Sequence, residues 1–249
     1  MRLVLNNYSE KMEIYIGTSG WKYSWNPDGL KWYVEHSGFN AVELNMSFYS
    51  FPREKQVENW KKVGSSLRWA IKVHRSITHI RRLNEKSLQV WKRFRERFRY
   101  LEGSIDFYLF QLPPSLTFNE TVFKRLVSYS KLCEKIALEP RNKTWFKAEV
   151  VKSVSELGIY IVTPDSPLYE GLPDIGVIVS KDTVYIRMHG RLTWYNYGYL
   201  DEELEEVAEK IINAKPKKAY VFFNNNHDML GDGRRLKEII LEKIGKSNQ

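Results

Sequence analysis

The sequence predicts an α/β protein built as a single (β/α)8 TIM-type barrel. Eight short β-rich runs alternate with segments of helical period, and this order indicates a parallel sheet. The length of 249 residues suits one such barrel, and no linker or composition shift marks a second domain. Charged residues fall late in several strands, where barrels place their active sites. Periodicity alone leaves an open doubly wound sheet as an alternative.

The predicted strands are short runs rich in β-branched and aromatic residues. They cover residues 13–17, 41–45, 68–73, 106–112, 135–140, 159–165, 183–190 and 218–225. The segments between them are amphipathic, as in residues 85–98, where Trp91, Phe94 and Phe98 form an apolar stripe. The other clear amphipathic segments are residues 53–63, 119–132, 201–214 and 233–244.

The barrel domain is expected to cover residues 13–245, with residues 1–12 as an N-terminal extension and Met12 as an alternative start to Met1. The composition, 43% hydrophobic and 28% charged, is typical of a globular protein. No run of about 18 apolar residues and no cleavable signal is present, so we expect no membrane partner. The single cysteine, Cys133, excludes an intrachain disulfide and favours the cytoplasm.

An arginine and a histidine interrupt the apolar run of residues 183–190. Alternate residues of a strand share a face, so Arg187 and His189 lie on one face and the apolar residues lie on the other. Other strands repeat this pattern, with Glu43, Lys72 and Glu139 late in their runs. In a barrel this face points inward, so we expect these side chains to converge at the carboxyl ends of the strands. Asp165 and Asn224 are expected to join them.

Carboxylates beside cations are suited to acid/base chemistry on an anionic substrate. Neighbouring cations lower the pKa of one carboxyl group while burial raises that of another, so a proton donor and a proton acceptor coexist at neutral pH. The predicted catalytic residues are Glu43, Glu139, Asp165 and His189. Aromatic residues in the loops after the strands suit a planar base or a sugar face. The predicted substrate-binding residues are Lys72, Arg187, Asn45, Tyr49, Trp21, His79, Gln111, Arg141, Trp145, Asn224 and Asn225.

The alternative is that these charges only satisfy one another in a buried structural network. The two interpretations differ in the expected effect of removing one charge, because breaking a buried ion pair costs about 3–5 kcal/mol. A pocket at the barrel mouth stays solvated, so the site interpretation predicts that Glu139→Gln and His189→Asn each change the free energy of unfolding by less than about 1 kcal/mol.

Eight short motifs along the chain resemble those of a known family. They are "IGTSGW", "VELNMSFY", "KVHRSITH", "LFQLPP", "ALEPRNKTW", "DSP", "YIRMHG" and "FFNNN". In this order they resemble the domain-of-unknown-function 72 family, also called YecE-like, over about residues 14 to 240. The resemblance implies a TIM-type barrel with the motifs at the carboxyl ends of the strands, and no established reaction. Pro164 departs from the small residue that usually precedes the aspartate of the sixth motif.

The predicted function is therefore an enzyme, with hydrolysis favoured, acting on an anionic small molecule or a nucleotide-like substrate without a cofactor. One alternative is a divalent-metal-dependent phosphodiesterase with histidine and carboxylate ligands. Against it, Lys72 and Arg187 would repel a dication, and no metal-binding spacing is present. The other alternative is a non-catalytic barrel that binds nucleic acid, because the net charge is +9 and residues 92–99 are rich in arginine.

Overall fold

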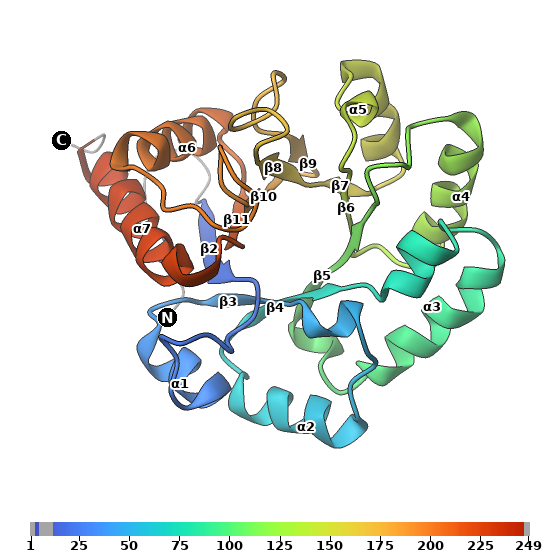
Figure 1. Cartoon of the computed structure of the whole chain (residues 1–249), viewed down its shortest axis with the longest axis horizontal. Helices are drawn as coiled ribbons and strands as arrows, with labels where there is room; N and C mark the ends of the chain where they lie inside the picture. The colour runs from blue at the N-terminus through green and yellow to red at the C-terminus, as the bar shows by residue number, and fades with distance from the viewer. Residues whose placement is uncertain (1–2, 5–11, 247–249) are drawn as a thin grey trace.

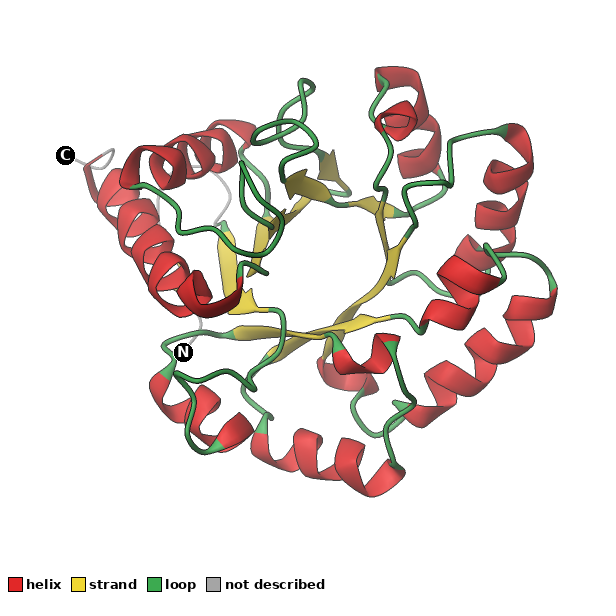
Figure 2. Ribbon diagram, viewed as in Figure 1, coloured by secondary structure: helices red, strands yellow, loops and turns green. Residues whose placement is uncertain are grey.

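A computed structural model of the chain describes residues 3–4 and 12–246 (Figure 1). The strands lie around a central axis and the helices lie outside them (Figure 2). The choice between Met1 and Met12 as the start falls largely outside the described residues. In the described part, no helix is long and apolar enough to cross a membrane.

The strands form two hydrogen-bonded sheets. One follows the order β1-β2-β11-β10-β8, with β9 paired to β10, and the other follows β3-β4-β5-β6-β7. All pairings are parallel except those of the two short strands β1 and β9. The strands are β1 (Leu3–Val4), β2 (Glu13–Thr18), β3 (Ala41–Leu44), β4 (Arg68–Lys72), β5 (Ile105–Gln111), β6 (Ile136–Glu139), β7 (Tyr160–Ile161), β8 (Thr163–Asp165), β9 (Val179–Ser180), β10 (Thr183–Met188) and β11 (Lys218–Phe223).

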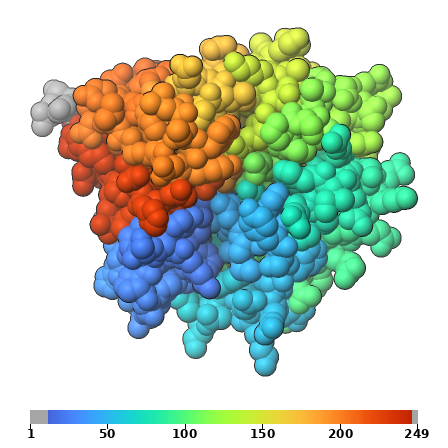
Figure 3. Space-filling model, in the orientation of Figure 1, coloured from blue at the N-terminus to red at the C-terminus, as the bar shows by residue number. Residues whose placement is uncertain are grey.

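Two contacts connect the sheets. Ser19, just after β2, forms a parallel bridge with Glu43 at the end of β3. The predicted strand 159–165 is divided into β7 and β8, one in each sheet. Between them, the N–H of Val162 donates to the carbonyl of Leu138 at 2.9 Å. The result is a TIM-barrel-like arrangement in which the first and last segments of the chain lie side by side (Figure 3).

Seven α-helices surround the strands in the described chain. They are α1 (Gly29–His36), α2 (Glu54–Val63), α3 (Lys86–Arg97), α4 (Glu120–Ser130), α5 (Ala148–Glu156), α6 (Asp201–Ala214) and α7 (Met229–Lys246). The prediction of eight strand–helix units is wrong after β8, where the described residues 166–182 form turns and β9 instead of a helix. Pro167 and Pro173 break the helical pattern there, and Gly171 and Gly176 have positive φ angles.

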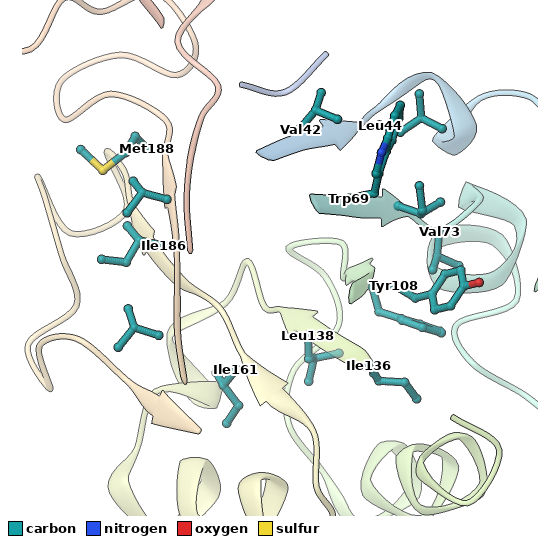
Figure 4. Packing of buried hydrophobic residues seen from close by; sticks show 14 of the residues in the cluster. Val42, Leu44, Trp69, Val73, Tyr108, Ile136, Leu138, Ile161, Ile186 and Met188 are labelled. Carbon is teal, nitrogen blue, oxygen red and sulfur yellow. The ribbon is translucent and has the colours of Figure 1, made fainter. Parts of the chain in front are cut away.

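The two faces of the strands differ as the alternation predicts. Val42, Leu138 and Met188 belong to the large buried cluster that includes helix residues such as Trp60 and Leu126 (Figure 4). The opposite faces form a separate cluster inside the ring of strands, consisting of Tyr15, Ala41, Ala70, Phe107, Leu109, Ala137, Val162, Tyr185, Tyr220 and Phe222. The inward charges predicted from the sequence continue these inner faces toward the carboxyl ends of the strands.

Candidate functional site

Arg187 lies at the centre of a buried group of charges. Its guanidinium donates to Glu43 through Nε at 2.9 Å and through Nη2, and to Glu139 Oε2 through Nη1 at 2.5 Å. All three side chains are fully buried. They come from β10, β3 and β6, so the contacts connect strands of both sheets.

His189 and Arg141 extend this group beyond Glu139. Glu139 Oε1 lies 2.8 Å from Arg141 Nη2 and 2.8 Å from His189 Nε2. On the other side of the ring, Nδ2 of Asn224 lies 3.2 Å from His189 Nδ1. Nε2 of His189 also lies 3.1 Å from Nη2 of Arg141. The five side chains Glu43, Glu139, Arg141, Arg187 and His189 form what we call the ionic network.

The charge states within the ionic network follow from its contacts. Burial alone would raise the pKa of Glu139, but Arg141, Arg187 and His189 hold it well below its usual range, so the carboxylate is ionised. Burial and the two guanidinium groups hold the pKa of His189 well below its usual range, so the imidazole is neutral. Neither group therefore changes its charge near pH 7.

The ionic network is also closed to solvent. Glu43, Glu139, Arg187 and His189 have no exposed surface. The expectation of a solvated pocket around Glu139 and His189 is therefore wrong, because their partners lie in the protein interior with them. A small effect on stability from Glu139→Gln or His189→Asn is no longer expected.

Two partners of Glu43, Ser19 and Tyr185, are not among the predicted site residues, although alternation puts Tyr185 on the face of Arg187. Ser19 donates to Oε1 of Glu43 at 2.8 Å, and Tyr185 donates to Oε2 of Glu43 at 2.7 Å. Both residues continue inward faces, Ser19 after Tyr15 in β2 and Tyr185 before Arg187 in β10. Strand alternation extended by one residue past β2 would have identified Ser19.

Lys72 is the inward cation that makes no ion pair. Its side chain is 9% exposed, and Nζ lies 4.5 Å from the centre of the Phe48 ring. Within the described residues Nζ has no hydrogen-bond or salt-bridge partner. Burial and the charge of Arg187 lower the pKa of Lys72 to about 7, although Glu139 and Glu43 act in the opposite direction. The amine therefore titrates near neutrality.

His79 is a second titratable group beside Phe48. Its ring meets the Phe48 ring edge-on at 4.9 Å, and Nδ1 lies 2.9 Å from the hydroxyl of Thr78. Burial and the charges of Lys72 and Arg141 lower the pKa of His79. The structure thus brings this predicted residue close to Lys72.

The loop after β10 packs over Arg141. The ring of Trp194 lies 4.4 Å from the guanidinium carbon of Arg141, and the rings of Trp194 and Tyr195 lie 5.5 and 5.7 Å from that of His189. Gly190 begins this loop with φ +96°, and a Cβ there would lie 2.5 Å from the carbonyl oxygen of Thr193. A glycine is therefore required for the loop to fold back over the ionic network.

Asp165 lies outside the ionic network, which corrects its predicted inward position. It pairs in register with Met188, whose side chain belongs to the outer cluster, and paired residues of parallel strands share a face. Its carboxylate accepts from Tyr199 Oη at 2.7 Å and from Arg191 Nε at 3.2 Å. Pro164 takes the inward position instead. The carboxylate of Asp165 thus anchors the loop after β10, while its backbone carbonyl accepts from the N–H of His189 at 2.8 Å.

Two other predicted residues have structural partners, and a third lies at the surface. Trp145 is buried, and its indole N–H donates to the carbonyl of Leu116 at 2.8 Å. Asn225 is buried and donates to the carbonyl of Tyr197 at 2.7 Å. These contacts place Trp145 and Asn225 in the packing of the loops. Tyr49 is 68% exposed, so its side chain lies at the surface.

The remaining predicted residues lie at the edges of the site. Gln111 ends β5 on the same face as Leu109, pairs with Glu139 and is half-buried. Trp21 and Asn45 line a cavity next to the ionic network. The structure therefore gathers most predicted residues at one end of the strands, but in more than one group.

Cations already engage both carboxylates of the ionic network. Arg187 binds Glu43 and Glu139, and Arg141 binds Glu139. Across residues 3–4 and 12–246, no group of three or more His, Cys, Asp or Glu side chains is placed to hold a metal ion. The metal-dependent phosphodiesterase thus has no identified ligand set in this part of the chain.

The arginine-rich segment around α3 is extensively paired. Arg97 and Arg99 lie 3.7 and 3.0 Å from Glu54, and Arg95 lies 3.6 Å from Glu102. Side-chain carboxylates thus neutralise several of the charges that a nucleic-acid backbone would need. Nucleic-acid binding stays an alternative prediction.

Together, the fold and the buried charges define a TIM-barrel-like α/β protein with an ionic network at the carboxyl ends of its strands. The family model described as "Protein of unknown function DUF72" matches residues 15–245, so the chain belongs to the DUF72 family. This confirms the resemblance seen in the eight motifs. No curated protein matches the chain.

Solved structures with the same fold include two members of this family. A DUF72 family protein from Thermotoga maritima is 26% identical, with a TM-score of 0.81 over 92% of this chain and 99% of that one. Another, from Enterococcus faecalis, is 19% identical, with a TM-score of 0.80 over 92% and 95%. A xylose isomerase-like TIM barrel/4-hydroxyphenylpyruvate dioxygenase fusion protein is 14% identical, with a TM-score of 0.60 over 95% of this chain and 44% of that one. The last likeness concerns the fold alone.

Proposed function

We propose that this chain is an enzyme that carries out acid/base chemistry, with hydrolysis favoured, on an anionic small molecule at the carboxyl ends of the strands. Lys72 is the proton-transferring group. The observation that carries this proposal is a nearly buried amine without a hydrogen-bond or ion-pair partner in the described residues, next to a saturated ionic network. If the buried charges only stabilised the fold, we would expect Lys72 to have an ion-pair partner as well, because an unpaired buried charge destabilises the fold.

The roles of the carboxylates change in this proposal. Glu43 and Glu139 hold Arg187 in place, and the neutral His189 supports Glu139. Burial, together with the fixed charge of Arg187, then lowers the pKa of Lys72 and keeps its amine partly neutral near pH 7. The charged and titratable groups near Lys72 are Arg187, Glu139, Glu43, Arg141 and His79.

Arg141 supplies the second part of an anion site. Its Nη2 contacts Glu139, but its buried Nε has no hydrogen-bond partner among the residues that the structure describes. A buried donor without a partner indicates that an acceptor from a ligand completes it. Arg141 takes the place of Arg187 as the partner of Lys72 in anion binding, because both carboxylates already bind the predicted substrate-binding residue Arg187.

Hydrolysis suits these groups. The neutral amine of Lys72 accepts a proton from an attacking water, and Arg141 holds the anionic group of the substrate.

A single buried cysteine, Cys133, also supports a reducing compartment such as the cytoplasm.

We also infer that the strands close into one barrel of eight, with β7 and β8 counted as a single strand. The bridge between Ser19 and Glu43 supports closure on one side, and the division of residues 160–165 between the two sheets supports it on the other. Closure would direct all the inner faces to one opening, where Lys72 lies.

A substrate screen tests the proposal. Wild type and Lys72→Met are incubated with phosphate monoesters, phosphodiesters, sugar phosphates, nucleotides and their uncharged analogues, and products are identified by mass spectrometry. We expect wild type to convert at least one anionic compound and none of the uncharged analogues, and Lys72→Met to convert none. Equal conversion by both proteins, or conversion of the uncharged analogue alone, contradicts the proposal.

A further inference from the structure

A cavity of about 410 Å³ lies beside the ionic network. It is open to solvent on one side and is lined by the loops after β2 and β3 and by α2. Its volume falls within the range of about 300–1,000 Å³ that is typical of small-molecule sites. Its lining includes Ser19, Trp21, Tyr23, Asn45, Met46 and Trp60.

Flat aromatic side chains form much of the cavity wall. The rings of Trp21 and Trp60 meet edge-on at 5.8 Å, and both are at most 8% exposed. Tyr23 stacks on Trp25 at 5.5 Å, which fixes the orientation of its ring. Rigid aromatic walls of this kind suit a planar ring better than a flexible chain.

Asn45 supplies a polar group to this cavity. Its Oδ1 is buried and has no hydrogen-bond partner. A carboxamide presents an acceptor and donors side by side, which matches the hydrogen-bonding edge of a nucleobase, and of adenine in particular. With the carboxamide turned so that Oδ1 faces the cavity, an occupant with such an edge would pair with it, whereas a purely apolar ring would leave it unpaired.

Ser19 connects the cavity to the ionic network. It lines the cavity, donates to Glu43 at 2.8 Å and lies 3.4 Å from Arg187 Nη2. Arg187 therefore lies beyond the inner end of the cavity, and Lys72 contacts Phe48, two residues after the cavity-lining Met46. A molecule that joins a planar ring to an anionic group would use both regions.

We propose that this cavity binds the base of a nucleotide, with adenine as the best match, while the phosphate reaches Lys72 and Arg141. Binding of the phosphate at Lys72 and Arg141 rests on the proposed function. Binding of the base in the cavity does not. Adenosine therefore tests the cavity alone, and ribose 5-phosphate tests the anion site alone.

Calorimetric titrations with AMP, adenosine and ribose 5-phosphate provide the test. We expect AMP to bind at least about tenfold more tightly than ribose 5-phosphate, because the base adds its own contacts. Asn45→Leu is expected to weaken the binding of AMP and adenosine by about tenfold or more and to leave the binding of ribose 5-phosphate unchanged. Lys72→Met is expected to weaken the binding of ribose 5-phosphate and to leave the binding of adenosine unaffected.

Met46→Trp provides a second variant that fills the cavity from a partly exposed position, and it is expected to weaken AMP and adenosine. Leu192→Trp is the matched control, because Leu192 is 73% exposed and does not line the cavity. Equal binding of AMP and ribose 5-phosphate, or unchanged AMP binding in a folded Asn45→Leu protein, overturns the inference. If wild type binds AMP and adenosine as expected but does not bind ribose 5-phosphate, the result counts against the anion site and not against the cavity.

Discussion

Arg187→Met is expected to lower the free energy of unfolding by about 3–5 kcal/mol. The substitution leaves two carboxylates, Glu43 and Glu139, in the protein interior without their shared cation. Both are fully buried, so water cannot solvate them without rearrangement of the strands. Chemical denaturation at pH 7 with no ligand measures the loss.

Arg99→Met is the matched control for this experiment. Arg99 also pairs with a carboxylate, Glu54, but both side chains are more than a third exposed. Solvent screens such a pair, so its removal should leave the free energy of unfolding nearly unchanged. If Arg187→Met is as mild as Arg99→Met, the buried ionic network does not stabilise the fold.

Lys72→Arg is expected to reduce kcat by about 10²–10⁴-fold on the substrate that the screen identifies, the usual contribution of a general base. Arginine keeps the positive charge, so anion binding should be largely retained. A guanidinium does not lose its proton near neutral pH, however, so it cannot act as the base. The variant therefore separates binding from proton transfer.

The pH dependence of the wild type follows from the same group. A base acts in its neutral form, and the pKa of Lys72 is lowered to about 7. The neutral fraction grows as the pH rises through this value, so kcat/KM should increase between about pH 6 and pH 8. Lys72→Arg should lose this increase. An arginine variant with full activity and an unchanged pH profile would assign proton transfer to another residue.

Much of the fold was predictable because strand alternation is a local property. Small and charged residues on one face and large apolar residues on the other indicated the direction of Glu43, Lys72, Glu139 and Arg187 correctly. The missing helix after β8 was also visible in principle, since Pro167 and the later glycines break the pattern. The order of strands and helices alone did not show that this unit departs from the others.

The ion pairs and hydrogen bonds of the site were less predictable, because they depend on contacts between strands that are distant in the sequence. Alternation placed Glu43 and Arg187 on inner faces, but it did not show that Arg187 would saturate two carboxylates and leave Lys72 unpaired. Asp165 was misplaced because alternation puts it on the face of Ile159 and Ile161, which belong to the outer cluster with Met188. Trp145 follows an inward residue in sequence, yet its loop turns the indole into the packing.

The most direct test is the pKa of the Lys72 amine in the folded protein. Lysine labelled with ¹³C at Cε gives a signal that shifts as Nζ titrates, and the absence of one signal in Lys72→Arg assigns it. The proposed function predicts a midpoint at about pH 7. A midpoint near the value of about 10.4 for an exposed lysine would mean that Lys72 stays charged at neutral pH, and it would contradict the proposed role of this residue.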